Sequence, residues 1–122
     1  MTPVGKRLLP PLELEVMKAL WQLGESTVRE VNTEMNRRRP LAYTTVMTLL
    51  DRLARKGAAA RLKQGRAFLY RPIISRRAAL EMAVDRVALD FFGGSRDRLL
   101  AHLEGQDSEA AVPEETLDAA LL

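Results

Sequence analysis

The chain of 122 residues is long enough for one compact domain with a small appendage, and its lack of cysteine excludes a disulfide framework and thiolate metal ligands. No apolar run reaches the length of a membrane span and the N-terminus lacks the apolar stretch of a signal peptide, so we expect a cytoplasmic protein without membrane insertion. Residues 1–74 carry 14 Lys and Arg against 6 Asp and Glu, whereas residues 75–122 carry 5 against 10. The first part suits a polyanion, although uneven charge also occurs on a solvated surface without a partner.

The first 40 residues predict two helices. Pro10 and Pro11 suit a helix start, apolar residues then recur at helical spacing, and Gly24 supplies a stop. The segment TVRE at residues 27–30 has the pattern of a capping box, in which the threonine and glutamate side chains each accept from the other residue's backbone amide. A second helix should follow and end before Pro40, because the residue before a proline avoids helical angles.

A third helix is predicted over residues 41–57, LAYTTVMTLLDRLARKG, ending at Gly57. Its buried stripe has the spacing of an amphipathic helix and consists of Val46, Leu49, Leu50 and Leu53. The opposite face carries threonines, which are mediocre helix formers. Either one of the first two, Thr44 or Thr45, merely caps the helix, or the exposed face has a use for short hydroxyl side chains.

From residue 58 the period changes to that of two short strands. Leu62, Phe68 and Tyr70 fit alternate strand positions, and Gly65 can take a positive φ in a turn over residues 63–66. Basic residues decorate this hairpin.

The C-terminal part predicts further helices. Ser75 can cap a fourth helix to about residue 92, Ser95 can cap a fifth, and Pro113 can open a short last helix. The fourth helix has apolar residues at the spacing of a coiled-coil seam, namely Leu80, Val84, Val87 and Phe91. A second copy of the chain could cover this seam, or the fifth helix could fold back over it.

Three helices followed by a basic hairpin is the order of a winged helix-turn-helix, whose third helix enters the DNA major groove while the hairpin lies on the backbone. We therefore expect a mainly α fold with a small antiparallel β-wing. Residues 8–73 would form the winged-helix DNA-binding domain and residues 74–122 a helical dimerisation region. Short threonine side chains let the helix approach the groove, where a hydroxyl can bond and a methyl can touch thymine.

Several basic side chains are candidate phosphate contacts. On the third helix these are Arg52, Arg55 and Lys56, with a solvated surface or a salt bridge as the alternative for Arg52. On the hairpin, the candidates are Lys63 and Arg66, which could likewise contact phosphate or belong to a solvated surface. Tyr43 either contacts DNA or packs under the preceding loop.

Four segments, PLELEVMKALWQLGESTVREV, LAYTTVMTLLDRLARKG, GRAFLYRP and FFGGS, strongly resemble the penicillinase repressor (BlaI/MecI/CopY) family of winged-helix transcriptional regulators. The likeness runs in order from about residue 9 to residue 103. It implies a homodimeric repressor whose partner is a double-stranded, palindromic operator with TACA/TGTA-like half-sites.

The resemblance also implies site residues. Family contacts with bases and backbone carry onto Thr44, Thr45, Met47, Thr48 and Arg52, and wing contacts onto Lys63 and Arg66. Positions 44 and 47 are basic in some staphylococcal-type members, so base preference within the half-site can differ here. Dimer contacts would come from the C-terminal helices, at Leu80, Val84, Val87, Phe91, Phe92, Leu99, Leu100 and Leu103.

Family members are switched off in two ways. A membrane sensor metalloprotease triggers cleavage in the penicillinase type, at a bond that aligns with His102-Leu103 here. A cysteine-rich tail binds metal in the copper type, which the absence of cysteine argues against. Derepression by proteolysis or by another signal is therefore the expectation, with no cofactor or bound metal.

Catalysis is not expected, because one histidine without cysteine cannot form the usual metal or nucleophile clusters. The remaining alternative is a winged-helix module for protein contacts or RNA without operator specificity. Basic residues on both the third helix and the hairpin favour DNA.

Overall fold

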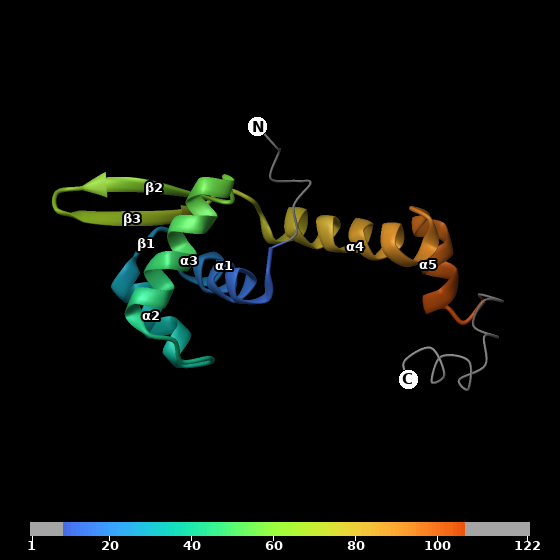
Figure 1. The fold of residues 1–122 in the computed structure, drawn as a ribbon, viewed down its shortest axis with the longest axis horizontal. Coiled ribbons are helices and arrows are strands. Elements are labelled where there is room, and N and C mark those ends of the chain that lie inside the picture. The colour runs from blue at the N-terminus through green and yellow to red at the C-terminus, as the bar shows by residue number, and fades with distance from the viewer. Residues whose placement is uncertain (1–8, 107–122) are drawn as a thin grey trace. The chain divides into compact units, whose positions relative to one another are not determined.

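The computed structural model describes residues 9–106, which contain five helices and a small sheet (Figure 1). In chain order the elements are α1 (Pro11–Leu23), β1 (Ser26–Thr27), α2 (Val28–Asn36), α3 (Tyr43–Lys56), β2 (Ala59–Gln64), β3 (Ala67–Pro72), α4 (Arg76–Phe92) and α5 (Arg96–Leu103). The first five predicted helices are confirmed, and the short helix predicted from Pro113 lies outside the described residues. None of the helices in residues 9–106 combines the length and apolarity needed to cross a membrane.

The core of the first unit lies between α1, α2 and α3. The stripe predicted for α3 is fully or almost fully buried. It packs with apolar residues of the other two helices, chiefly Val16, Met17, Leu20, Val31 and Met35. Burial of one such side chain contributes about 1.5–3 kcal/mol, so the stripe fixes α3 about its own axis. The opposite face of α3 is thereby turned outward.

The segment that joins α1 to α2 is both a helix cap and a strand. The predicted capping box is present, with Glu30 N donating to Thr27 Oγ1 at 3.1 Å and Thr27 N donating to Glu30 Oε1 at 2.8 Å. Ser26 and Thr27 also pair with Tyr70 and Leu69 of β3. The sheet is therefore three-stranded and antiparallel in the order β1-β3-β2, whereas the sequence predicted two strands.

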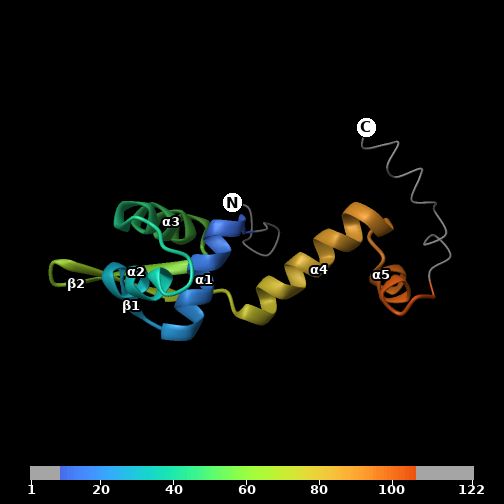
Figure 2. The ribbon, with the colours of Figure 1, turned by 90° about the horizontal axis from the view of Figure 1, so that it is seen from below.

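The hairpin turn is shorter than predicted. Gln64 pairs with Ala67, so only Gly65 and Arg66 form the loop, and Lys63 belongs to β2 rather than to the turn. Gly65 has a φ of 62°, the left-handed value that a two-residue hairpin needs at this position and that only glycine adopts readily. In both views the hairpin tip projects beyond the three helices (Figures 1 and 2).

The start of α4 belongs with the first unit. Trp21 Nε1 donates to the carbonyl of Ile74 at 2.9 Å, and the Arg76 guanidinium lies 5.5 Å from the centre of the Trp21 ring. Met82 joins the core, and the chain divides into two compact units between Met82 and Ala83, within α4. The boundary at residues 73 and 74 that the sequence indicated coincides instead with the junction of β3 and α4.

The second unit joins the end of α4 to α5 through a turn at Gly93 and Gly94. Gly94 N donates to the carbonyl of Ala88 at 2.9 Å, and Ala88 is buried. Arg96 Nε donates to Asp85 Oδ1 at 2.7 Å, linking the two helices. The two hydroxyl caps predicted from the sequence are present, since Ser75 accepts from Ala78 N and Ser95 accepts from Arg98 N.

Candidate nucleic-acid interface

The outward face of α3 carries most of the predicted DNA-binding residues. The side chains of Tyr43, Thr44, Met47, Thr48 and Arg52 are exposed, and that of Thr45 is half-buried. The N-cap of α3 is Ala42, and no side chain caps the helix. The alternative that Thr44 or Thr45 merely caps the helix is therefore wrong.

Thr48 makes a hydrogen bond within the helix. Its Oγ1 donates to the carbonyl oxygen of Thr44 at 3.0 Å, one turn earlier. A hydroxyl has one proton and two lone pairs, so Oγ1 in this arrangement can still accept a hydrogen bond. The methyl group of Thr48 is also available for an apolar contact. This short side chain therefore offers both a hydrogen-bond acceptor and an apolar group.

A groove of about 490 Å³ separates α3 from the hairpin. Tyr43 and Met47 lie on its helix side, and Arg66, Ala67 and Phe68 on its hairpin side. The start of α2 closes it with Thr27, Val28 and Arg29. Arg29 is exposed and was not among the predicted DNA-binding residues. Its place in the groove depends on the pairing of β1 with β3, which sequence spacing does not reveal.

A second groove of about 280 Å³ runs along the other side of α3. It is lined by Leu12 of α1 and by Thr44, Thr45, Thr48, Leu49 and Arg52. Among residues 9–106 no ion pair of Arg52 occurs, so the salt-bridge alternative for this side chain is not observed. The exposed face of α3 thus lies between two grooves. Each groove is lined by at least one arginine.

Two of the three cations predicted on α3 are held by carboxylates. Lys56 Nζ lies 2.5 Å from Glu13 Oε1, in a contact where the glutamate is almost fully buried. Lys56 therefore fastens α3 to α1, and the expectation that it reaches phosphate is wrong. Arg55 Nε lies 2.9 Å from Asp51 Oδ2, but 80% of its side chain is exposed, so it can still turn outward.

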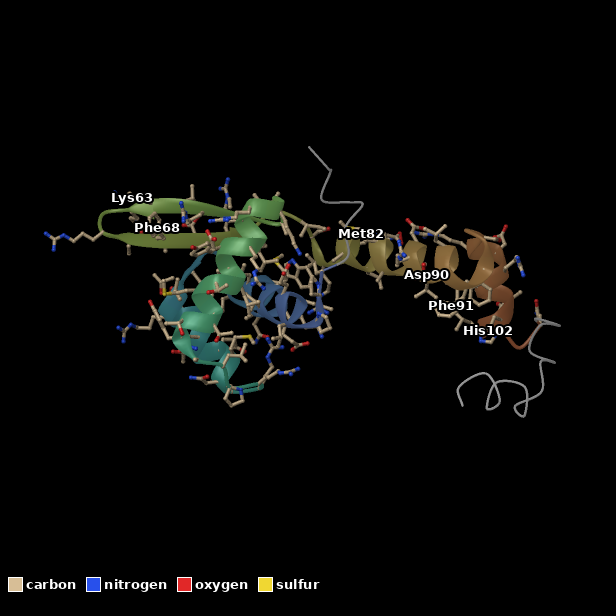
Figure 3. The ribbon with its side chains drawn as sticks, viewed as in Figure 1. Lys63, Phe68, Met82, Asp90, Phe91 and His102 are labelled. Carbon is tan, nitrogen blue, oxygen red and sulfur yellow. The ribbon has the colours of Figure 1, made fainter. Side chains whose placement is uncertain are left out.

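The hairpin offers cations near its tip. Lys63 is exposed and lies directly across from Phe68 in the β2–β3 ladder (Figure 3). Arg66 occupies the exposed turn. The Arg61 guanidinium lies 4.6 Å from the centre of the Phe68 ring and 3.7 Å from Asp51 Oδ1. Arg61 therefore connects the hairpin to α3.

The residues predicted for dimerisation are largely exposed on α4 and α5. The exposed fraction reaches 76% at Phe91 and 72% at Leu103, and Leu80, Val87 and Leu100 are also exposed. Val84, Phe92 and Leu99 are half-buried. The ring centres of Phe92 and His102 are 5.6 Å apart, whereas Phe91 has no such partner in the described chain (Figure 3). Leu89 is 58% exposed and was missed because it lies off the predicted seam.

Two features of the described residues bear on metal binding and on acid–base chemistry. Within residues 9–106 no three His, Cys, Asp or Glu side chains come together in a way that could hold a metal ion. The Asp85 carboxyl has a pKa below its ordinary value, because Arg96 donates a hydrogen bond to it. This pair joins α4 to α5 within the second unit.

Comparisons with known proteins agree with this geometry. A family model described as "Penicillinase repressor" matches residues 9–119. The transcriptional regulator BlaI of Mycobacterium tuberculosis is 42% identical over 96 residues, which cover 77% of this chain and 70% of the relative. The penicillinase repressor of Bacillus licheniformis is 30% identical over 95 residues, covering 78% and 74% respectively.

Two solved structures resemble the first unit. The solution structure of the DNA-binding domain of the repressor BlaI has a TM-score of 0.55 and 33% identity, covering 64% of this chain and 93% of that one. The monomeric form of Bacillus licheniformis BlaI, solved in complex with the blaP half-operator, has a TM-score of 0.51 and 34% identity, covering 60% and 89%. Both support a winged-helix fold.

Proposed function

The chain belongs to the penicillinase repressor family, and from this membership we propose that it is a DNA-binding transcriptional repressor that acts in the cytoplasm as a homodimer on an inverted-repeat operator. The observation that carries the proposal is the outward face of α3, with short hydroxyl side chains in its N-terminal half and a groove lined by arginine on each side. The family is one of repressors, and the BlaI relative solved with a half-operator supports DNA as the ligand.

In this proposal α3 enters the major groove and the two hollows beside it accept the DNA backbone. Thr44 and Thr48 face base edges, where a short side chain can bond a base or touch a thymine methyl. Arg29 and Arg66 neutralise phosphates on the hairpin side, and Arg52 does so on the other. Tyr43 and Met47 provide apolar contact with sugars in the larger groove.

The exposed apolar residues of α4 and α5 support the homodimer. Leu80, Val87 and Phe91 lie on one side of α4, and Leu89 lies on the opposite side. A helix with apolar residues on both sides is typical of a buried position. A second copy, related by a two-fold axis, would cover this surface and set two recognition helices on a palindrome.

Derepression by proteolysis or by another signal completes the proposal. The Asn-Phe bond cut in staphylococcal family members aligns with His102-Leu103 on α5, where the residues differ and Leu103 is exposed. A membrane sensor metalloprotease would be the partner for that route. Cutting there would separate Leu103 from the apolar surface of α4 and α5.

The test compares an inverted repeat of TACA and TGTA half-sites with a scrambled duplex of the same composition. We expect tighter binding to the repeat, with an affinity that falls by about 10³-fold or more between about 50 and 200 mM salt if six or more phosphates are contacted. Equal affinity for the two duplexes would contradict sequence-specific repression and favour the alternative module for protein or RNA.

Thr48→Glu tests the role of α3 directly. The new carboxylate would face DNA phosphates and base acceptors, so we expect operator binding to be lost while the oligomeric state, measured by light scattering, is retained. The matched control is Thr33→Glu, the same change at an exposed position of α2 that lines neither groove. Normal binding by the Thr48 variant would refute the assignment of α3 as the recognition helix.

A further inference from the structure

Asp51 places a negative charge on the side of α3 that faces DNA in the proposed complex. It follows Thr44 and Thr48 at helical spacing, and Arg55 continues the same row. A carboxylate there repels phosphates, so a surface selected only for affinity for DNA would not carry one. Its presence therefore requires an explanation in terms of its contacts.

Both oxygens of the Asp51 carboxylate are engaged by arginines. Oδ2 lies 2.9 Å from Arg55 Nε, on the next turn of α3, and Oδ1 lies 3.7 Å from Arg61 Nη1, on the hairpin. The side chain of Asp51 is 36% exposed, compared with 80% for Arg55 and 46% for Arg61. The half-buried carboxylate of Asp51 thus pairs with two arginines whose side chains are both more exposed than its own.

Arg61 is also held from the other side. Its guanidinium lies 4.6 Å from the centre of the Phe68 ring, so it is stacked between the aromatic ring of the hairpin and the carboxylate of α3. Phe68 itself lines the larger groove beside Met47 and Arg66. Asp51 therefore restrains one cation on α3 and one on the wing.

We propose that Asp51 is a specificity-determining residue that holds Arg55 and Arg61 away from phosphates until the operator is correctly seated. The proposal rests on the DNA-binding function proposed above. Exposed ion pairs are weak, so a phosphate in the right place can replace Asp51 as the partner of either arginine. A loosely bound, wrong sequence presents its phosphates at other positions and does not displace the carboxylate.

The consequence concerns sequence-independent binding. Free arginines attract every duplex alike and raise affinity without selecting sequence. Asp51 lowers this sequence-independent part of the affinity, because it neutralises part of the positive charge on α3 and the hairpin. The ratio of operator affinity to non-specific affinity is larger as a result.

The test is Asp51→Asn in the full chain, which keeps the shape of the side chain and removes its charge. Binding to a scrambled duplex and to the TACA/TGTA inverted repeat is measured by fluorescence anisotropy. We expect the variant to bind the scrambled duplex about threefold to tenfold tighter, with a salt dependence steeper by about one counterion per released arginine. The preference for the repeat should fall.

Asp90→Asn is the matched control. Asp90 is paired with Arg86 four residues away on α4, at 3.0 Å, so this variant makes the same change in charge and releases an arginine far from α3 in the sequence (Figure 3). It should bind both duplexes like the unmodified protein. Adding Arg55→Gln to Asp51→Asn should return the salt dependence toward that of the unmodified protein.

Two results would overturn the proposal. Equal behaviour of the Asp51 and Asp90 variants on the scrambled duplex would show that Asp51 restrains nothing, and weaker binding of the Asp51 variant to both duplexes would show that it supports binding directly. If the unmodified protein does not prefer the repeat, the proposed repressor function fails. The comparison on the scrambled duplex still decides the role of Asp51 in that case.

Discussion

Thr48 shows how a residue that is poor for helix stability can suit the surface it occupies. Its hydroxyl returns to the carbonyl of Thr44, which satisfies the proton inside the helix and leaves an acceptor for a partner. A base with an exocyclic amino group, adenine or cytosine, presents the complementary donor in the major groove. In the proposed complex, the conformation of this side chain therefore limits Thr48 to base edges that donate a hydrogen bond.

The contact between Lys56 and Glu13 leads to a prediction about stability. Glu13 is 4% exposed at its side chain and Lys56 is 20% exposed. In the Lys56→Met variant the carboxylate would be buried without its cation, so we expect the free energy of unfolding to fall by about 3 kcal/mol. Urea denaturation followed by circular dichroism measures the change.

Two further variants distinguish this cause from a general effect of removing lysine. Lys18→Met breaks the half-buried i,i+3 pair with Glu15, whose side chain is far more exposed than that of Glu13, and should change stability by about 0.5 kcal/mol or less. Adding Glu13→Leu to Lys56→Met removes both charges, and most of the lost stability should return. A Lys56 variant as stable as the Lys18 variant would contradict a structural role for the buried pair.

At the level of elements, the contact between α4 and α5 should depend on pH. The hydrogen bond from Arg96 lowers the pKa of Asp85, so the folded state favours the charged carboxylate. A group with a lowered pKa stabilises the fold above its unfolded pKa, about 4 for aspartate, and this contribution is lost as the pH falls through the folded pKa. The α4–α5 contact should therefore weaken only in acid.

Carbon-detected NMR titration of the Asp85 carboxyl group checks this expectation. In the unmodified protein its midpoint should lie below that of the same group in Arg96→Gln, which lacks the charged donor. Identical midpoints in the two proteins would show that the Arg96 contact does not form in solution.

The helices could be predicted from the sequence because each carries its own boundaries. The prolines before α1, the capping box of α2 and the serines before α4 and α5 act over three or four residues. The apolar stripe of α3 likewise needs only its own spacing. Local signals of this kind are present in a single segment and need no knowledge of the rest of the fold.

The features that the sequence did not reveal depend on contacts between distant segments. β1 has two residues, too few for any periodicity, and its pairing is set by the position of β3. Arg29 reaches the groove only because that pairing brings the start of α2 beside the hairpin. Lys56 follows Arg55 directly, yet one helical step turns it toward Glu13, 43 positions away in the chain.

For the whole molecule, the proposed dimer predicts the effect of Phe91→Asp. Phe91 is 76% exposed in the single chain, and a carboxylate there would be buried without a partner in the dimer. We expect a monomer by sedimentation, with a folded first unit and an affinity for the palindrome reduced by about 10²-fold or more through loss of avidity.

The control for this variant is Ile73→Asp, an equally large change at an exposed position before α4. Ile73 is outside the residues assigned to the dimer, so that variant should remain dimeric. A monomeric unmodified protein at micromolar concentration, or a dimeric Phe91 variant, would contradict the dimer assigned to α4 and α5.

The long-range bonds of the first unit also bear on the order in which the chain folds during synthesis. The core helices end at Lys56, whereas the hydrogen bond from Trp21 joins residues 53 positions apart and must wait for Ile74 to emerge from the ribosome. Contacts of large separation form late because closing a longer loop costs more entropy. The nascent chain therefore completes α3 before this hydrogen bond can form. The core itself is completed only when residues of the hairpin and of α4, among them Tyr70, Ile74 and Met82, join the three helices.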